Sequence, residues 1–489
     1  MANSDSHIAH GTWGNRGLAA LLMALTVWQA LAFPVAGILL SGGLLIYFAV
    51  LVRSQLSWLI VVPALLPVLY LAPWSGRILW DCFDLLLMAT LAGALWHGYY
   101  RNSNTHKRHY VPIFAALMLF SISWLLSLAI GLFPLDPYDA NAISNYHSSY
   151  NALRIGKSLL WALLLLLPVH RCWNHDPELA NRYLTGGASL GLLFLGIIVL
   201  AERGVFQAVT QAQNIYGLVG PLLDFSTTYR VTGLFADMHT GGAAIDAYLL
   251  LTLPFALYGA ISNKTVALRV VCIIACVLGL YSLLVTFSRT TYIAMLLSFG
   301  IFAAGFYLKA GTGKIPHPLL RLVATPLCLL ALYLFLFAKG GTVSLIAGAG
   351  TGAVGMLAPG LRARFGKLPI AFLIGCTALF ALVISCYGMA TSKWVDNKLA
   401  EVLLYSLLGV SLTVLITHYL AAGLTAVANL KQTVILTAVI TLGCILTIPS
   451  LFGTRMVERF SVIDTDISTR ASHTLTSLGL MDHKLSTLL

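Results

Sequence analysis

The chain has few charged residues and lacks long polar stretches outside three loops. Only 9% of its 489 residues are Asp, Glu, Lys or Arg, whereas 59% are hydrophobic. A water-soluble protein cannot bury so much apolar surface, but a bilayer needs about 20 apolar residues for each helix that crosses it. The composition therefore excludes an ordinary soluble enzyme and indicates a protein that crosses a membrane many times.

Motifs for metal ions, phosphate loops and disulfides are also absent. There is no HExxH sequence, no Cys/His cluster and no carboxylate pair at ligand spacing, so we expect neither a metal site nor a cofactor. The run at 309–314 has two glycines and two lysines, but its spacing is wrong for a phosphate loop and it follows no predicted strand. None of the eight cysteines lies in a long outer loop, which argues against a disulfide framework.

Apolar segments follow one another from Leu18 to Ser450 with short polar breaks between them. Lipid offers no hydrogen-bond partners, so each segment must satisfy its own backbone groups as a helix. We therefore predict an all-α polytopic protein with roughly 13–15 transmembrane helices in one membrane domain, residues 1–450. The predicted segments are 18–33, 35–52, 57–72, 82–100, 110–132, 158–170, 185–201, 242–261, 269–287, 290–308, 318–337, 343–359, 368–388, 402–424 and 432–450.

Basic residues predict how these segments are oriented. With the N-terminus in the cytoplasm, the short outer breaks hold only Arg77, Arg289, Lys339, Lys393 and Lys398. The inner breaks hold many more, as the positive-inside rule requires, so the net charge of +12 needs no nucleic-acid partner. The inner basic residues are Arg16, Arg53, Arg101, Lys107, Arg108, Arg171, Arg182, Lys264, Arg269, Lys309, Lys314, Arg321, Arg362, Arg364, Lys367 and Lys431. Those at 362–367 are suited to anionic lipid headgroups.

The three long polar stretches all fall on the predicted outer face. They are residues 133–157, 202–241 and a C-terminal segment, 451–489. Loops of this length in a membrane protein commonly carry function. We therefore expect the functional site on the outer face.

Two arginines on that face are candidates for an anion site. Arg289 lies between two strongly apolar segments with almost no loop, and Arg230 lies where the loop at 202–241 returns to the membrane. Both can be interface anchors whose side chains reach outward. Alternatively, two planar guanidinium groups on one face suit the oxygens of a diphosphate better than lysines would.

The surroundings of these arginines resemble the O-antigen ligase and polymerase-like superfamily. The resemblance covers most of the chain from about Asp81 onward. Its residues are Arg230-Val-Thr-Gly-Leu-Phe, Gly241-Gly-Ala-Ala-Ile-Asp-Ala-Tyr-Leu-Leu-Leu-Thr-Leu-Pro254, Thr286-Phe-Ser-Arg289, Asn151-Ala-Leu-Arg-Ile-Gly-Lys157 and Arg459-Phe-Ser…Asp464…Asp466…Arg470-Ala-Ser-His473.

The resemblance implies a glycosyltransferase with GT-C-like architecture in the bacterial inner membrane. Members of this family move a glycan from an undecaprenyl-pyrophosphate-linked glycan donor to an acceptor at the periplasmic face, without nucleotide sugar or metal. The acceptor is the lipid A core for a ligase and a growing glycan for a polymerase. The family's two essential arginines correspond to Arg230 and Arg289, which would hold the donor diphosphate.

The general base is the point at which this chain departs from the family pattern. In the ligases, the base histidine lies in a large periplasmic loop where this sequence has only 451–489. That segment is either the start of a larger loop or a sign of different acid–base chemistry. The outer histidine nearest to Arg230 in the sequence is His239. It lies beside Asp237 and the glycines Gly241 and Gly242, where a ligand can approach the backbone closely.

Two further interpretations are open. Asp246 lies inside an apolar segment, which is costly for an acid, so a structural pair with Arg230 or Arg289 is expected. As an alternative to the enzyme, the chain can be a transporter of a polysaccharide precursor or a small anion. A transporter is expected to show internal repeats and broken helices, and the sequence shows no convincing repeat.

Overall fold

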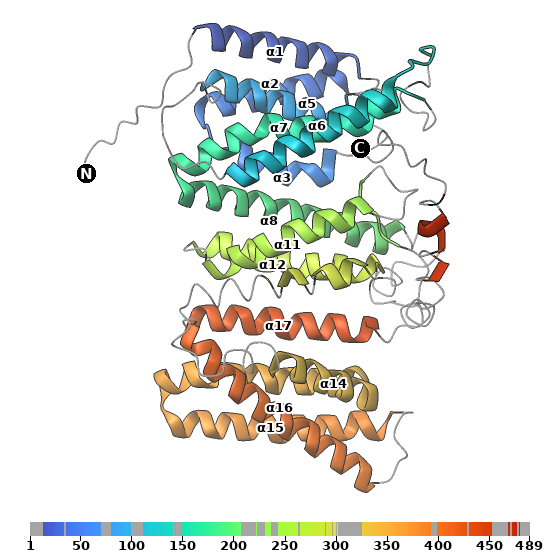
Figure 1. The fold of residues 1–489 in the computed structure, drawn as a ribbon. Coiled ribbons are helices and arrows are strands. Elements are labelled where there is room, and N and C mark those ends of the chain that lie inside the picture. The colour runs from blue at the N-terminus through green and yellow to red at the C-terminus, as the bar shows by residue number, and fades with distance from the viewer. Residues whose placement is uncertain are drawn as a thin grey trace, which may run out of the picture. The chain divides into compact units, whose positions relative to one another are not determined.

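The structure is a computed structural model in which most of the chain is helical (Figure 1). Within the residues that it describes, every regular element is a helix and no strand occurs, which confirms the all-α prediction. The described residues are 13–33, 36–69, 80–98, 111–139, 142, 148–206, 222, 230–235, 243–262, 265–288, 290–295, 297–299, 301, 325–392, 399–427, 430–451, 468–469, 472–476 and 479.

Most helices overlap the predicted apolar segments, but α7 and α8 begin earlier than the predicted 158–170 and 185–201, and residues 302–308 of the segment 290–308 lie outside the described residues. Eight described helices are long and apolar enough to cross a membrane, and α2, α3 and α5 are shorter apolar helices. The prediction of a protein embedded in a membrane is thus confirmed. The helices are α1 (Trp13–Leu31), α2 (Gly37–Arg53), α3 (Trp58–Leu69), α5 (Cys82–Trp96), α6 (Val111–Leu132), α7 (Asn151–His175), α8 (Pro177–Ala201), η1 (Glu202–Phe206), α11 (Ala243–Ser262), α12 (Val266–Val285), α14 (Thr325–Phe365), α15 (Lys367–Ala390), α16 (Leu399–Val427) and α17 (Leu430–Leu451).

The chain forms two compact units. Unit 1 contains Met1–Gly187, Leu234–Ala236 and Ile463–Leu489, and unit 2 contains Ala188–Gly233 and Asp237–Val462. Helix α8 begins in unit 1 and continues into unit 2.

Helix α5 is the core of unit 1. It packs against α1, α2, α3 and α7, and all its residues from Cys82 to Ala94 are buried except Phe83. A helix that is apolar on every side is stable only when other helices surround it. One polar contact fixes its position, because the hydroxyls of Tyr47 in α2 and Thr90 in α5 lie 2.9 Å apart.

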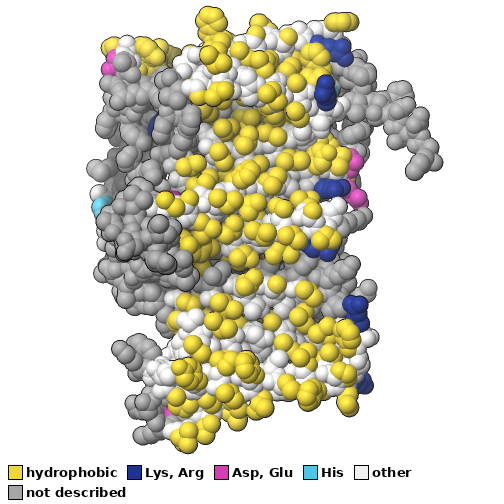
Figure 2. Space-filling view, turned by 180° about the vertical axis from the view of Figure 1, so that it is seen from behind, with side chains coloured by type: hydrophobic (Ala, Val, Ile, Leu, Met, Phe, Trp, Pro, Cys, Tyr) yellow, Lys and Arg dark blue, Asp and Glu magenta, His cyan; other side chains and the backbone are white. Residues whose placement is uncertain are grey.

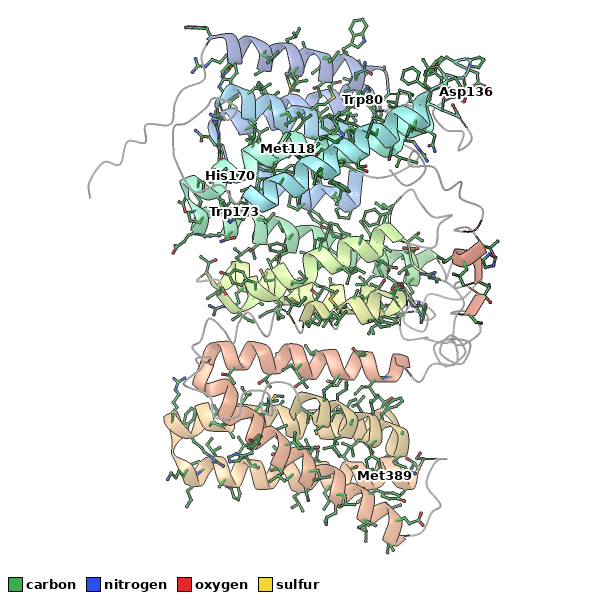
Figure 3. All side chains as sticks on the ribbon, in the orientation of Figure 1. Trp80, Met118, Asp136, His170, Trp173 and Met389 are labelled. Atoms are coloured by element: carbon green, nitrogen blue, oxygen red, sulfur yellow. The ribbon has the colours of Figure 1, made fainter. Side chains whose placement is uncertain are left out.

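Contacts at one end of unit 1 agree with the predicted sidedness. The guanidinium carbon of Arg16 lies 5.4 Å from the ring centroid of Trp96, and Arg171 donates a hydrogen bond of 2.8 Å to the carbonyl of Gly98. The start of α1 and the ends of α5 and α7 therefore share one end of the unit, as the charge pattern predicts. Figure 3 shows His170 and Trp173 at this end, with Trp80 and Asp136 toward the other.

Helix α14 in unit 2 is a hairpin of two helices. Its backbone leaves helical geometry at Gly341, which has φ 63° and ψ −161°. The two halves pack against each other, because Cβ atoms built on Gly348 and Gly352 would overlap the side chains of Leu336 and Tyr333. This confirms the predicted break between segments 318–337 and 343–359, and α15, α16 and α17 pack around the hairpin.

The sides of the helices expose many large apolar residues, as expected for surfaces that face lipid. In α15, Leu368 is 85% exposed and Phe372 is 74% exposed. Figure 2 shows hydrophobic side chains over the flanks of the helices, with Lys and Arg side chains near helix ends.

Candidate functional site

The segment at residues 230–233 is held against the end of α8. Helix α8 continues into a π-helical turn at Glu202–Phe206. The carboxylate of Glu202 accepts hydrogen bonds from the backbone N–H groups of Thr232 (3.1 Å) and Gly233 (2.9 Å). Gly233 has φ 64°, a left-handed conformation that glycine adopts without steric cost. Glu202 therefore fixes the turn that follows Arg230.

Arg230 is anchored by one of its three guanidinium nitrogens. Its Nε donates a hydrogen bond of 2.8 Å to the carbonyl oxygen of Thr286. Thr286 caps the C-terminus of α12, where carbonyl groups lack partners in the helix and the helix dipole favours a cation. Among the described residues, this is the one hydrogen bond that the Arg230 side chain makes. No described residue accepts a hydrogen bond from the four N–H donors on its two Nη atoms.

The end of α12 presents a cluster of hydroxyl groups. Thr286 donates its hydroxyl hydrogen to the carbonyl of Leu283 (2.8 Å), and Thr291 donates to the hydroxyl oxygen of Ser288 (2.8 Å). The Ser288 hydroxyl also lies 3.2 Å from that of Thr290. These hydroxyl groups lie on both sides of the point where α12 ends. The helix ends there because Phe287 adopts a left-handed φ of 50°.

Phe287 is held in this unusual conformation by a buried arginine. A left-handed residue other than glycine costs roughly 1–2 kcal/mol. The Phe287 side chain is fully buried, and the guanidinium carbon of Arg203 lies 5.7 Å from its ring centroid, within range of a cation–π interaction. Arg203 is itself 0% exposed. Tight packing between these two side chains stabilises the bend that leads to Arg289.

Asp246 lies in the first turn of α11, next to this bend. It is 9% exposed, and its carboxyl group faces the hydroxyls of Thr286, Ser288 and Thr291 and lies within electrostatic reach of Arg230. The expected pairing with Arg230 is therefore electrostatic, without a direct ion pair between the two described side chains. Because α11 and α12 pack together, the start of one helix and the end of the other meet here.

The structure tests only part of the predicted site. Arg230 and Asp246 are described, and they lie close to each other as expected. Arg289, Asp237, His239, Gly241 and Gly242 lie outside the described residues, so their roles stay predictions. Glu202 and Arg203 were not among the predicted site residues, although two charged residues directly after an apolar helix were a signal that they have buried partners.

Unit 1 contains a second charged cluster, at the start of α5. Lys157 in α7 forms ion pairs with Asp81, at 3.0 Å, and with Asp84. The two acids also form a capping box, because each side chain accepts a hydrogen bond from the other residue's backbone N–H (2.8 and 2.9 Å). Trp161 donates from its indole nitrogen to Asp84 at 2.7 Å, and its ring packs against that of Trp80.

We expect Glu202→Ala to destabilise the protein by about 2 kcal/mol, because two backbone N–H groups lose a charged acceptor. Thermal unfolding of the detergent-solubilised protein measures the effect. Glu178→Ala is the matched control, since Glu178 lies in the first turn of the same helix and is exposed. Glu202→Gln keeps one acceptor oxygen and should fall between the two. Equal midpoints for Glu202→Ala and Glu178→Ala would contradict the anchoring role.

Comparisons with known proteins add no assignment. No family model, curated protein or solved structure matches this chain. Among the described residues, no group of three or more His, Cys, Asp or Glu side chains is placed to hold a metal ion. The chemistry of the site must therefore be argued from its own side chains.

Proposed function

We propose that this chain is a membrane glycosyltransferase that transfers or polymerises a glycan carried on undecaprenyl diphosphate. The proposal rests on how the guanidinium group of Arg230 is held. Its Nε is fixed to the end of α12, while its two Nη groups keep the parallel donors that grip phosphate oxygens in pairs. A simple interface anchor would not need its guanidinium fixed to a helix end.

The position of Arg289 in the sequence supports the same role. It is three residues from Thr286, the partner of Arg230, and three residues span at most about 10 Å. Two guanidinium groups attached so close together can hold one diphosphate between them. The resemblance to O-antigen ligases and polymerases, whose essential arginines correspond to these two, points to the same ligand.

The reaction follows from this placement. An acceptor hydroxyl oxygen forms a bond to the anomeric carbon of the donor glycan, and the bond from that carbon to the diphosphate breaks. Undecaprenyl diphosphate then leaves with the bonding electrons. The arginines stabilise the negative charge as it develops, which is a preorganised electrostatic contribution. The enzyme would have GT-C-like architecture and act at the periplasmic face of a bacterial inner membrane.

Purified protein in detergent, given an undecaprenyl-diphosphate-linked glycan, tests the proposal. We expect release of undecaprenyl diphosphate that depends on an acceptor, and EDTA should not change the rate because the arginines supply the positive charge. Lipid A core as the effective acceptor would identify a ligase, and a second glycan chain would identify a polymerase.

The same assay separates the enzyme from a transporter. Detergent micelles do not separate two compartments, so a transporter has no activity in them and forms no glycan product. If neither acceptor supports release of undecaprenyl diphosphate, the enzyme proposal is wrong. Uptake of the donor or of a small anion into proteoliposomes, without any transfer, would instead identify a transporter.

A further inference from the structure

One carboxylate oxygen of Asp246 is buried and has no hydrogen-bond partner among the described residues. An ionised carboxylate accepts about four hydrogen bonds, yet no described residue donates one to the buried Oδ1 of Asp246. A buried polar atom without a partner is costly. Such an atom in a candidate site indicates a donor that arrives with the ligand.

Two of the three described hydroxyl groups that face Asp246 also bind other acceptors. Of the three that face it, Thr286 gives its hydrogen to the carbonyl of Leu283 and Thr291 gives its hydrogen to Ser288. Only the Ser288 hydrogen remains, and the hydroxyl of Thr290 competes for it. With Thr286 and Thr291 hydrogen-bonded in this way, Oδ1 of Asp246 receives no hydrogen bond from the described residues.

We propose that Asp246 binds the acceptor hydroxyl and acts as its general base. This inference rests on the glycan transfer proposed above and supplies the proton acceptor that transfer requires. The hydroxyl hydrogen passes to Oδ1 of Asp246 as the hydroxyl oxygen bonds to the anomeric carbon. The bond from that carbon to the diphosphate breaks, and the leaving diphosphate keeps the electron pair.

The position of Arg230 allows Asp246 and the donor diphosphate, which are both negatively charged, to lie close together. A carboxylate near a diphosphate is repelled unless a cation lies within reach of both. Arg230 is within electrostatic reach of Asp246, and the proposed diphosphate binds its Nη groups, which no described residue engages. The acceptor hydroxyl held by Asp246 would then lie beside the sugar carbon that the diphosphate leaves. Ser288, fixed by Thr291, can orient the carboxyl group.

The test compares Asp246→Asn with His239→Gln, the other candidate base, in the purified transfer assay. Asp246→Asn preserves shape but cannot accept the proton, so we expect kcat to fall at least about a hundredfold. Binding of undecaprenyl diphosphate should change by less than about threefold. The lost interaction, proton transfer to Asp246, is made only in the transition state and does not contribute to binding. Asp246→Glu keeps the carboxylate and should recover part of the rate. Glu401→Gln, an acid in the first turn of α16, is the matched control.

A structural role for Asp246 predicts a different result. Donor binding and thermal stability would then fall together with the rate, and Asp246→Glu would rescue none of them. A full rate in Asp246→Asn, or a large loss in His239→Gln alone, would overturn the inference and leave glycan transfer standing. If the wild-type protein transfers no glycan to any acceptor, both proposals fall.

A small carboxylate provides a readout that packing defects do not share. Asp246→Gly opens space where the carboxyl group was, and added formate can act as the missing base. We expect formate to raise the rate of Asp246→Gly severalfold and to leave the wild type and Glu401→Gln unchanged. No response to formate in a folded Asp246→Gly protein that still binds undecaprenyl diphosphate would count against a proton-transfer role.

Discussion

Arg230→Lys is expected to lower glycan transfer about a hundredfold, nearly as far as Arg230→Ala. Lysine keeps the positive charge but has no Nε to bind the Thr286 carbonyl and no fork for two phosphate oxygens. Loss of a charge-assisted contact to the transition state costs on the order of 3 kcal/mol, which corresponds to this rate effect. The measurement is release of undecaprenyl diphosphate by variants purified in equal amounts.

Arg53→Lys is the control for this prediction. Arg53 is exposed at the end of α2, where either basic side chain can reach the membrane interface, so its replacement should leave the rate unchanged. Arg289→Lys should behave like Arg230→Lys. Full activity in the double variant, Arg230→Lys with Arg289→Lys, would exclude a diphosphate clamp and favour the interpretation that both residues are anchors.

Lys157→Met is expected to destabilise unit 1 by about 3–5 kcal/mol. The substitution leaves Asp81 and Asp84 without their cation, and the Asp84 side chain is only 4% exposed. Removing one partner of a buried ion pair is far more costly than removing both, because the remaining charge has no compensation. Unfolding of the purified protein in mixed micelles by added SDS measures the difference.

The double variant Lys157→Met with Asp84→Asn tests the cause of that loss. Once the charges of Lys157 and Asp84 are gone, much of the stability should return. The remaining acid, Asp81, is the more exposed of the two, and the Asn side chain still accepts a hydrogen bond from Trp161. Lys367→Met serves as the control, because Lys367 is exposed at the start of α15. If the double variant is as unstable as Lys157→Met, packing of the lysine stem explains the effect and the charge does not.

Local composition predicted the helices well, and it failed where a charge is paired. The segment predicted at 158–170 is α7, which begins at Asn151. This short segment was expected to gain a turn from Arg154–Lys157, and the helix does include both residues. Each has a partner that allows it to lie in a helix: Asn151 for Arg154 and the two acids for Lys157. The break at Gly341 was predictable because lysine and two glycines interrupt the apolar run there.

The site was predictable only to the extent that its residues are unusual in a membrane. Arg230 and Asp246 are costly in lipid, and this cost drew attention to them. The contacts that build the site could not be found in the same way. Glu202 binds backbone groups 30 and 31 positions away, and Arg230 binds a carbonyl 56 positions away. No local sequence pattern predicts a contact between a carboxylate and the backbone of a distant turn.

The hairpin in α14 restricts the changes in length that this part of the chain can tolerate. Gly348 and Gly352 lie on the face of the second half that receives Leu336 and Tyr333 from the first half. One residue inserted between Gly341 and Gly348 would turn that face by about 100° and place larger side chains against both partners. Substitutions on the lipid-facing side can accumulate, whereas an insertion or deletion at this point would break the packing of the whole hairpin.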